Sequence, residues 1–148
     1  MAEIDRSVIG QWGPEGRLCV ERGKIMEFAR AVKDDNPVFT TGDAPPAPPT
    51  FLMTIAHWVG SLGETRQGMK LDYRRLLHGE QEFEYLRPIR AGDVLTFRSR
   101  TKDVFEKQGK RGGTMTFVLG ETEFRNQRGE VVAYMRNTLI ETADAVKE

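Results

Sequence analysis

The sequence predicts one α+β domain spanning residues 1–148, in which a long, curved antiparallel β-sheet wraps around a central α-helix. Two patterns predict this fold class. Residues 50–60 are apolar on most sides, which is typical of a buried helix, and after residue 80 apolar and polar side chains alternate in long runs, which is typical of strands. Because a helix and a sheet each bury an apolar surface, we expect the helix to fill the curve of the sheet.

The first elements precede this helix. A turn at residues 13–16 separates the amino terminus from a short strand expected at 17–21. A helix is predicted over 24–33, because Ile25, Phe28, Ala29 and Val32 form one apolar stripe and Pro37 stops the pattern soon afterwards.

Residues 40–49 hold four of the seven prolines, so they cannot form a helix or a central strand. Fewer than 50 residues precede them, too few for a separate core, so we interpret the stretch as a surface crossing within one domain. Thr50 is then a candidate N-cap of the buried helix, and Gly60 or Gly63 is its expected end.

Four strands are predicted in the second half of the chain. Their apolar positions alternate at Phe83 and Tyr85, at Leu95 and Phe97, from Met115 to Leu119, and at Val132 and Tyr134. Turns at 91–93, 109–113 and 126–129 separate them, which predicts an antiparallel meander of four consecutive strands, completed by the early strand.

Composition excludes several classes of function. The chain has 22 Lys and Arg residues against 22 Asp and Glu residues, which argues against nucleic acid and against a polybasic membrane attachment. No apolar run approaches the roughly 20 residues of a membrane span. The single cysteine and a start without signal-peptide features lead us to expect a cytoplasmic protein.

Several segments resemble the superfamily of MaoC-like dehydratases and (R)-specific enoyl-CoA hydratases, which have the hot-dog fold. They are Asp34–Phe39, Pro48–Phe51, Leu77–Tyr85 and Arg87–Asp93. The resemblance covers nearly the whole chain and is greatest for the amino-terminal type of MaoC dehydratase domain, also called FAS1-like. That domain is the half of a double hot dog that usually lacks the catalytic pair, so the resemblance implies a second, catalytic half.

Catalytic members of the superfamily carry a Gly-Asp-x-Asn-Pro-aliphatic-His signature, in which Asp and His share the acid and base work. Here the Asp and Asn positions are Asp34 and Asn36, but Phe39 stands at the His position. The resemblance therefore implies a remnant motif without a catalytic imidazole. Two alternatives stay open: an Asx-type turn without chemistry, or rescue by His57 or His78.

The resemblance also implies where a thioester would bind. Pro49, Thr50 and Phe51 open the central helix, near which the superfamily holds the thioester carbonyl, and a helix start favours developing negative charge. His78 is the better contact candidate of the two histidines, although it also fits an exposed turn residue, whereas His57 fits a packed helix residue. Two separated histidines and one cysteine do not make a metal site.

We therefore expect a subunit of a heteromeric (R)-3-hydroxyacyl-thioester dehydratase or enoyl-CoA hydratase, whose MaoC-type partner supplies Asp and His. The substrate would be a coenzyme A or acyl-carrier-protein thioester, and no cofactor is expected. Alternatives are a non-catalytic acyl-thioester-binding protein or a structural self-dimer, and last a thioesterase, since residues 50–60 contain no carboxylate. Five basic residues are candidates for coenzyme A phosphates or an acidic carrier: Arg74, Arg75, Arg87, Arg90 and Lys110.

Overall fold

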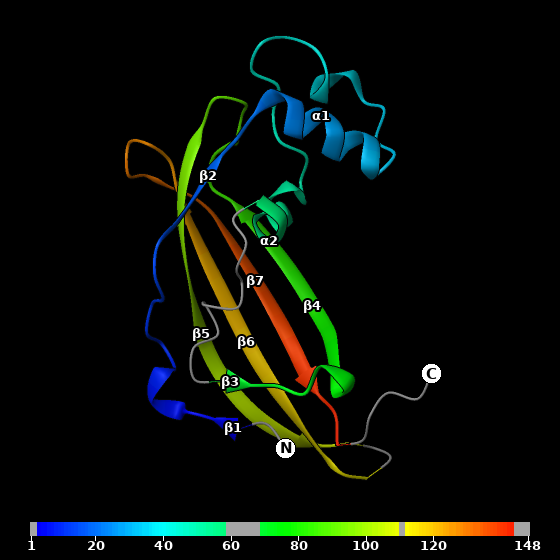
Figure 1. The fold of residues 1–148 in the computed structure, drawn as a ribbon, viewed down its shortest axis with the longest axis vertical. Helices are drawn as coiled ribbons and strands as arrows, with labels where there is room; N and C mark the ends of the chain where they lie inside the picture. The colour runs from blue at the N-terminus through cyan, green and yellow to red at the C-terminus, as the bar shows by residue number, and fades with distance from the viewer. Residues whose placement is uncertain (1–2, 59–68, 110–111, 144–148) are drawn as a thin grey trace.

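The computed structural model describes residues 3–58, 69–109 and 112–143. Its centre is a five-stranded antiparallel sheet in the spatial order β2-β5-β6-β7-β4 (Figure 1). The strands are β2 (Gly16–Cys19), β4 (Leu76–Tyr85), β5 (Val94–Gln108), β6 (Thr114–Arg125) and β7 (Val131–Glu141). A second, two-stranded sheet joins β1 (Glu3–Ile4) to β3 (Met69–Lys70) near the far end of the molecule. Among the described residues, no helix has the length and apolar character needed to cross a membrane.

The helical elements gather mostly at one end of the sheet. They are α1 (Arg22–Ala31), η2 (Pro37–Phe39), η3 (Phe51–Thr54) and α2 (Ile55–Trp58), while η1 (Arg6–Val8) and η5 (Tyr73–Arg75) lie at the other end. The predicted helix at 24–33 therefore begins and ends two residues earlier. Its buried stripe is narrower than expected, because Ile25 and Ala29 are buried while Val32, at the C-cap, is half exposed.

The predicted meander of four strands is wrong in one respect. Strands β5, β6 and β7 follow one another as expected, but β4 pairs with β7 rather than with β5. The proline-rich segment explains the difference, since Ala47 donates to the carbonyl of Ile89 (2.8 Å) and Ala91 donates to that of Pro45 (3.0 Å). These bonds hold the β4–β5 connection across the end of the sheet, so the segment is the intramolecular crossing that we expected.

The central helix begins as a 3₁₀ turn, η3, and continues as α2. Phe51, Leu52 and Ile55 are fully buried against the sheet. Thr50 is the N-cap residue by position, but its side chain makes no capping hydrogen bond, so the predicted cap is wrong in its chemistry. The expected helix ends at Gly60 and Gly63 lie outside the described residues.

Apolar side chains form two clusters on the same face of the sheet, which we call the inner face. The larger cluster joins η3 and α2 to Leu95, Phe97, Phe124 and Met135 at the helical end. The smaller one contains Val104, Val118 and Leu139 at the other end. The opposite, outer face carries ion pairs instead. Apolar and polar side chains therefore alternate along the strands, as expected for an antiparallel sheet with one covered face.

Irregular pairing increases the curvature of the sheet. Register shifts occur between Thr101 and Asp103 in β5 and between His78 and Glu80 in β4. Such bulges raise the local twist and bend the strand. The curve of the long strands is visible in Figure 1 and gives the inner face its hollow shape.

The two edges of the sheet differ. On the β2 side, the preceding chain continues along β5, because Gly10 donates to the carbonyl of Thr101 and Gly13 to that of Ser99, both at 2.8 Å. On the other side, β4 is the last strand of the sheet, and no described element pairs with its outer edge.

Candidate functional site

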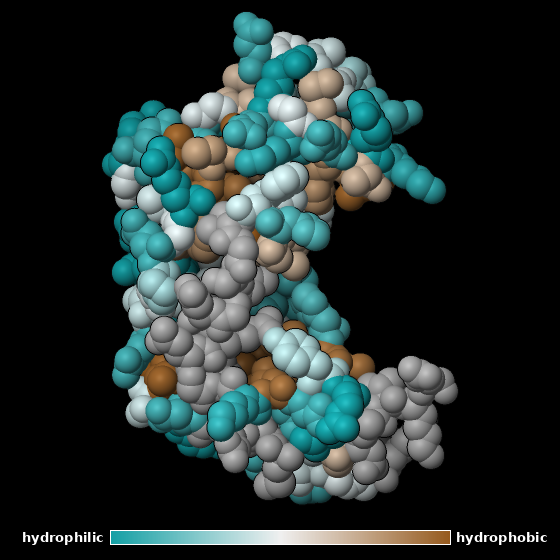
Figure 2. Space-filling view, viewed as in Figure 1, coloured by the Kyte–Doolittle hydropathy of each residue, from teal (hydrophilic) through white to brown (hydrophobic). Residues whose placement is uncertain are grey.

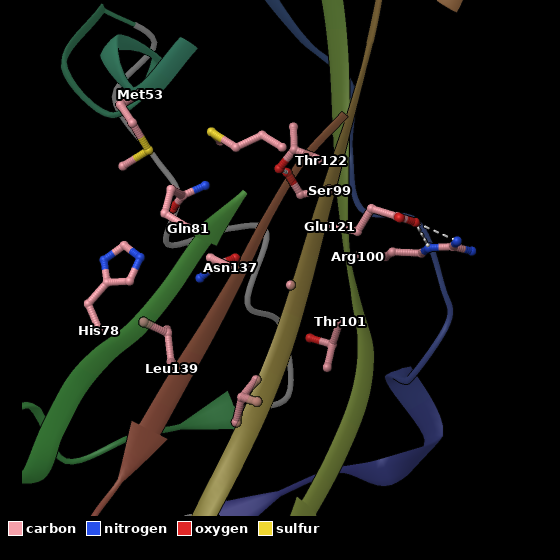
Figure 3. Close-up of a pocket in the computed structure, with 13 residues that line it drawn as sticks. Met53, His78, Gln81, Ser99, Arg100, Thr101, Glu121, Thr122, Asn137 and Leu139 are labelled. Atoms are coloured by element: carbon pink, nitrogen blue, oxygen red, sulfur yellow. Dashed lines mark hydrogen bonds and ion pairs between the residues drawn. The ribbon is translucent and has the colours of Figure 1, made fainter. Parts of the chain in front are cut away.

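A hollow of about 240 Å³ lies on the inner face of the sheet, between the two apolar clusters. Figure 2 shows the molecule hollowed at the level of β4, between α1 and the far end of the sheet. The wall is polar in its middle, where six side chains from four strands meet: His78, Gln81, Ser99, Thr101, Thr122 and Asn137. Met53, from η3, closes the hollow toward the helical end (Figure 3).

Strand register brings these residues together. Thr101 pairs with Gly120, Gly120 pairs with Asn137, and Asn137 pairs with Gln81. The four residues therefore form one row across β5, β6, β7 and β4, and they share the inner face because paired residues in a sheet point the same way. In the adjacent row, Ser99 pairs with Thr122. The two rows make a polar belt between the two apolar clusters of the inner face.

Most side chains of the belt already have partners. The hydroxyl oxygens of Ser99 and Thr122 lie 2.7 Å apart, and Gln81 Nε2 donates to the carbonyl of Arg136 at 3.0 Å. His78 Nε2 lies 3.1 Å from the carbonyl oxygen of Glu80. The side-chain amide of Asn137 makes no hydrogen bond to another described residue and lies in the hollow (Figure 3). Asn137 is therefore the belt residue most able to bind a polar group of a ligand.

Gly120 makes room for this amide. A Cβ atom at residue 120 would collide with Oδ1 of Asn137, so a side chain there would displace the amide from its place. The glycine is thus required by a close approach and not by an unusual backbone angle.

The segment that resembles the catalytic signature lies away from the hollow and forms a turn. Asp34 Oδ1 accepts a hydrogen bond from the amide of Asn36 (3.0 Å), and Asn36 Oδ1 accepts one from Val38 (3.0 Å). Phe39 is buried in the larger apolar cluster. The Asx-type turn expected at these residues is present, and Asp34, Asn36 and Phe39 do not line the hollow.

The three residues predicted at the helix start have different environments. Phe51 is fully buried and packs edge-on against Phe28, with ring centroids 5.7 Å apart. Thr50 is exposed, and the carbonyl of Pro49 accepts a hydrogen bond from the Tyr85 hydroxyl at 2.6 Å. The amide of Phe51 donates to the carbonyl of Pro48 at 3.0 Å. None of the three lines the hollow, and thioester binding at this helix start stays a prediction.

Burial around Tyr85 raises the pKa of its phenol to about 12. The phenol is protonated at neutral pH and donates a hydrogen bond to the carbonyl of Pro49. This bond connects the start of the central helix to β4.

The two histidines have different environments. His57 is exposed on α2, contrary to the expectation that it is packed, because the apolar stripe of this helix is formed by Phe51, Leu52 and Ile55. His78 is exposed too, yet it lines the hollow beside Gln81 and Leu139. Of the residues proposed from the sequence, His78 is the one that the structure brings to this wall.

Sequence reasoning missed the polar belt. Ser99, Thr101 and Thr122 occupy inward positions of strands that otherwise carry apolar residues there. Polar residues at the apolar phase of a period-two pattern are the signal by which the sequence could have predicted the belt. Asn137 could not be recognised in this way, because its phase depends on the pairing of β7 with β4 and β6.

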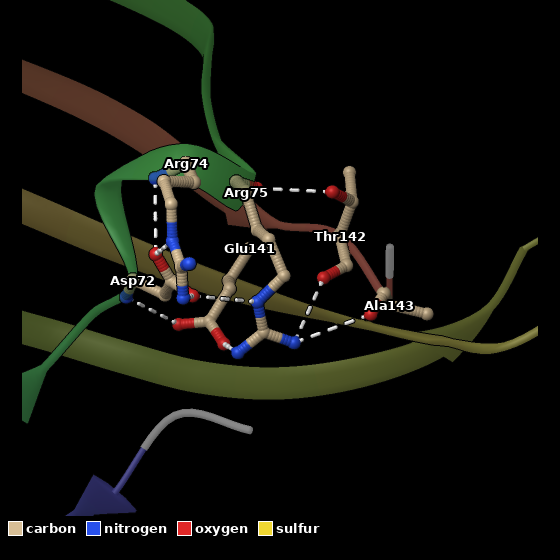
Figure 4. A network of polar contacts seen from close by, with 6 residues as sticks. All are labelled: Asp72, Arg74, Arg75, Glu141, Thr142 and Ala143. Carbon is tan, nitrogen blue, oxygen red and sulfur yellow. Dashed lines mark hydrogen bonds and ion pairs between the residues drawn. The ribbon is translucent and has the colours of Figure 1, made fainter. Parts of the chain in front are cut away.

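The predicted phosphate-binding cations are already engaged. Arg74 and Arg75 both contact Asp72, and Arg75 also donates to Glu141 and to the carbonyls of Thr142 and Ala143 (Figure 4). Elsewhere, Arg87 pairs with Glu130, and Arg90 donates to the carbonyl of Ala44. Lys110 lies outside the described residues. These contacts fix the ends of β4 and β7 and the crossing segment.

Comparisons with known proteins now give the family. Residues 7–135 match the model of the family described as FAS1-like, dehydratase domain region. The chain belongs to this family of FAS1-like dehydratase domains. Its relatives include a UPF0336 protein of Streptomyces avermitilis, 35% identical over 149 residues, with 95% of this chain and 96% of that protein covered. A UPF0336 protein of Tropheryma whipplei is 36% identical over 131 residues, covering 82% of this chain and 89% of that one.

Solved structures give the same fold for this FAS1-like domain. A chain of the HadBC (3R-hydroxyacyl-ACP dehydratase) complex of Mycobacterium tuberculosis superimposes with a TM-score of 0.72 at 27% identity, covering 93% of this chain and 98% of that one. A chain of the ChsH1-ChsH2 complex of the same organism gives a TM-score of 0.68 at 18% identity, over 93% and 87% of the two chains. The sheet around one central helix is therefore the hot-dog fold of MaoC-like dehydratases.

Proposed function

We propose that this FAS1-like domain is the non-catalytic subunit of a heteromeric (R)-3-hydroxyacyl-thioester dehydratase, or enoyl-CoA hydratase. In this proposal, it shapes the site of the acyl group while a MaoC-type partner supplies the catalytic Asp and His. The reaction removes a proton from C2 and hydroxide from C3 of the thioester, which gives the 2-enoyl thioester and water. The substrate would be carried by coenzyme A or by an acyl carrier protein.

The environment of Phe39 carries the proposal. A hydratase needs a group that moves a proton near C2, and phenylalanine has none. The Phe39 ring is buried in the larger apolar cluster, while the Asp34 carboxylate accepts the Asn36 amide in a turn. Both former motif positions thus have structural roles in this chain, which supports a catalytic pair contributed from elsewhere.

The similar solved structures also support a partner chain. HadBC and ChsH1-ChsH2 are complexes by name, and a MaoC-like dehydratase chain with a TM-score of 0.70 is covered to only 42% of its length by this chain, at 23% identity. This chain therefore matches less than half of that longer protein, whose remaining length leaves room for a second domain.

The hollow supplies the part that this subunit would play. Its two ends are apolar, as an acyl chain requires, and the belt between them offers the Asn137 amide to a polar atom of the acyl group. We propose that Asn137 orients the acyl group and does not itself move a proton, since a side-chain amide does not titrate at neutral pH.

The test is reconstitution. The purified chain alone is expected to show no hydration of a trans-2-enoyl-CoA, whereas the chain together with a MaoC-type subunit that carries the intact Asp and His should turn over at roughly 1 to 1,000 per second. Loss of the enoyl absorbance measures the rate. A comparable rate from the chain alone would refute the proposal.

A variant tests the role of the belt in the reconstituted enzyme. Asn137→Leu keeps the size of the side chain and removes its amide, so KM should rise roughly tenfold for an acyl group that bonds to it. Thr138→Val on the same strand points to the outer face and is the matched control, with KM unchanged. Equal kinetics of both variants would exclude Asn137 from the site.

A second candidate is an acyl-thioester-binding protein that acts without a catalytic partner. The observation that favours it is that side chains of this chain alone supply the polar wall of the hollow. Calorimetry with an acyl-CoA distinguishes the two: this function requires tight binding by the isolated chain, and the subunit function requires the partner before binding is tight.

A further inference from the structure

Strand β4 is an open sheet edge of unusual length. It runs for ten residues from Leu76 to Tyr85, and all of them are exposed except Leu76, Gln81 and Phe83, which are partly buried. Its ladder with β7 uses one side of the strand, so the backbone groups of the other side face outward. An edge of this length is a template for another strand. It carries neither proline nor lysine, which are common means of blocking such an edge.

The outward side chains of this edge are acidic. Glu80, Glu82 and Glu84 pair with Thr138, Arg136 and Tyr134 of β7, so all three lie on the outer face. No basic residue of β4 lies between them. The edge therefore presents three carboxylates at alternate positions, about 7 Å apart along the strand.

Arg136 neutralises this row only in part. Its Nη1 lies 2.6 Å from Glu82 and 2.8 Å from Glu84, and its Nε lies 2.8 Å from Glu121. One guanidinium is thus divided among three carboxylates. The side chains of Glu82 and Glu84 stay about half exposed, at 54% and 46%, and Glu80 forms no ion pair with a described residue.

A second copy of the chain, paired at this edge, would place carboxylates opposite this row of carboxylates. In an antiparallel pairing about a two-fold axis, residues whose numbers have a constant sum face each other. With the axis at residue 82, Glu80 faces Glu84 and Glu82 faces its own copy. An axis at 81 or 83 still places two pairs of carboxylates opposite each other. Like charges directly opposite across a ladder are destabilising.

We propose that the edge of β4 selects a partner strand with basic outward side chains and rejects a second copy of this chain. The partner is a protein that adds an antiparallel strand carrying Lys or Arg at alternate positions opposite Glu80, Glu82 and Glu84. This inference rests on the proposed function for the existence of a partner chain, and it deepens that function by naming the chemistry that recognises the partner.

A charge-reversed copy of the chain is the probe. The variant Glu80→Lys, Glu82→Lys, Glu84→Lys has the same edge with the opposite sign, and far-UV circular dichroism with thermal unfolding confirms that it is folded. In sedimentation velocity at low salt, the mixture of wild type and variant should form a 1:1 dimer. Its Kd should be at least roughly tenfold below that of either protein alone.

Salt and a neutral variant sharpen the test. About 1 M NaCl shortens the Debye length to about 3 Å, so it should weaken the mixed dimer and strengthen wild-type self-association. The neutral variant Glu80→Gln, Glu82→Gln, Glu84→Gln should strengthen self-association. It places no lysine beside Arg136, so it serves as the probe if the charge-reversed variant does not fold. The matched control is Glu15→Gln, Glu27→Gln, Glu106→Gln, three exposed residues off the edge, which should change nothing.

Two results would overturn the inference: wild type that self-associates as tightly as it binds the reversed copy, or no association in any mixture. Neither readout involves substrate or turnover. Failure of reconstituted catalysis would therefore count against the proposed function and leave the selectivity of the edge to be judged by these dimers.

Discussion

Phe39, at the position that the resemblance aligns with the catalytic histidine, belongs to the hydrophobic core. It is 9% exposed and belongs to the cluster that includes Phe51 and Phe97. An imidazole at this place would bring a polar ring into apolar surroundings without a described partner, which costs free energy. The packing of Phe39 therefore agrees with the proposal that this chain does not supply the catalytic imidazole.

A histidine introduced at residue 39 should not make the isolated chain active. We expect Phe39→His to lower the free energy of unfolding by about 2 kcal/mol, because the imidazole is buried without a hydrogen bond, and to leave the isolated chain inactive toward a 2-enoyl-CoA. Urea unfolding and a hydration assay measure the two effects. Phe39→Leu, which keeps an apolar side chain, should cost less. A stable, active histidine variant would show that residue 39 still faces a working site.

Glu121 is a buried carboxylate of the outer face that forms ion pairs with two arginines. Its side chain is 4% exposed, and although burial raises its pKa, hydrogen bonds from Arg136 and Arg100 outweigh that effect and lower the pKa to about 2. Because the folded-state pKa lies below the ordinary value of 4.5, the stabilisation is present above pH 4.5 and is lost as the pH falls toward 2.

The variant Glu121→Gln should therefore lower the free energy of unfolding at pH 7 by about 2 kcal/mol. The difference from wild type should shrink between pH 4.5 and 2. Urea titrations at several pH values measure it, with the exposed Glu106→Gln as control. A difference that does not change with pH would mean that Glu121 contributes through packing rather than charge.

At the scale of elements, the strands and the turn expected from local patterns are present, whereas the pairing partner of β4 was predicted wrongly. The turn at Asp34 and Asn36 depends on hydrogen bonds within four residues, and the sequence spacing predicts it. The placement of β4 beside β7 depends on bonds between the proline-rich segment and the β4–β5 connection, which no local pattern encodes. The polar belt depends on the same register, so Asn137 could not be found before β4 was placed.

Strand β6 shows how one residue fixes a wall of the hollow. Gly120→Ala should displace the Asn137 amide, because the added Cβ would occupy its place. We expect the free energy of unfolding to fall by about 1 to 2 kcal/mol. In the reconstituted enzyme, KM should rise as it does in Asn137→Leu. Gly129→Ala lies in a turn outside the hollow and separates a general loss of stability from the KM effect. An unchanged KM would place the acyl group elsewhere.

At the scale of the whole molecule, a partner should stabilise this chain. A ligand that binds only the folded state at about 100 times its Kd adds about 2.7 kcal/mol, which for a domain of this size raises Tm by roughly 5 to 10 °C. Thermal unfolding with increasing amounts of the MaoC-type subunit measures the shift. A Tm that does not depend on the concentration of that subunit would contradict the proposed assembly.

The difference between the two sheet edges also limits how far the sheet can extend by adding strands. The chain at Gly10 and Gly13 already occupies backbone groups of β5 beyond β2, and β2 itself offers only four residues. A long free edge is therefore present on one side of the described sheet. A sheet with one such edge can accept one strand and then end, whereas a sheet with two can extend into a filament. The fold thus has a valency of one, which permits a pair and opposes polymerisation.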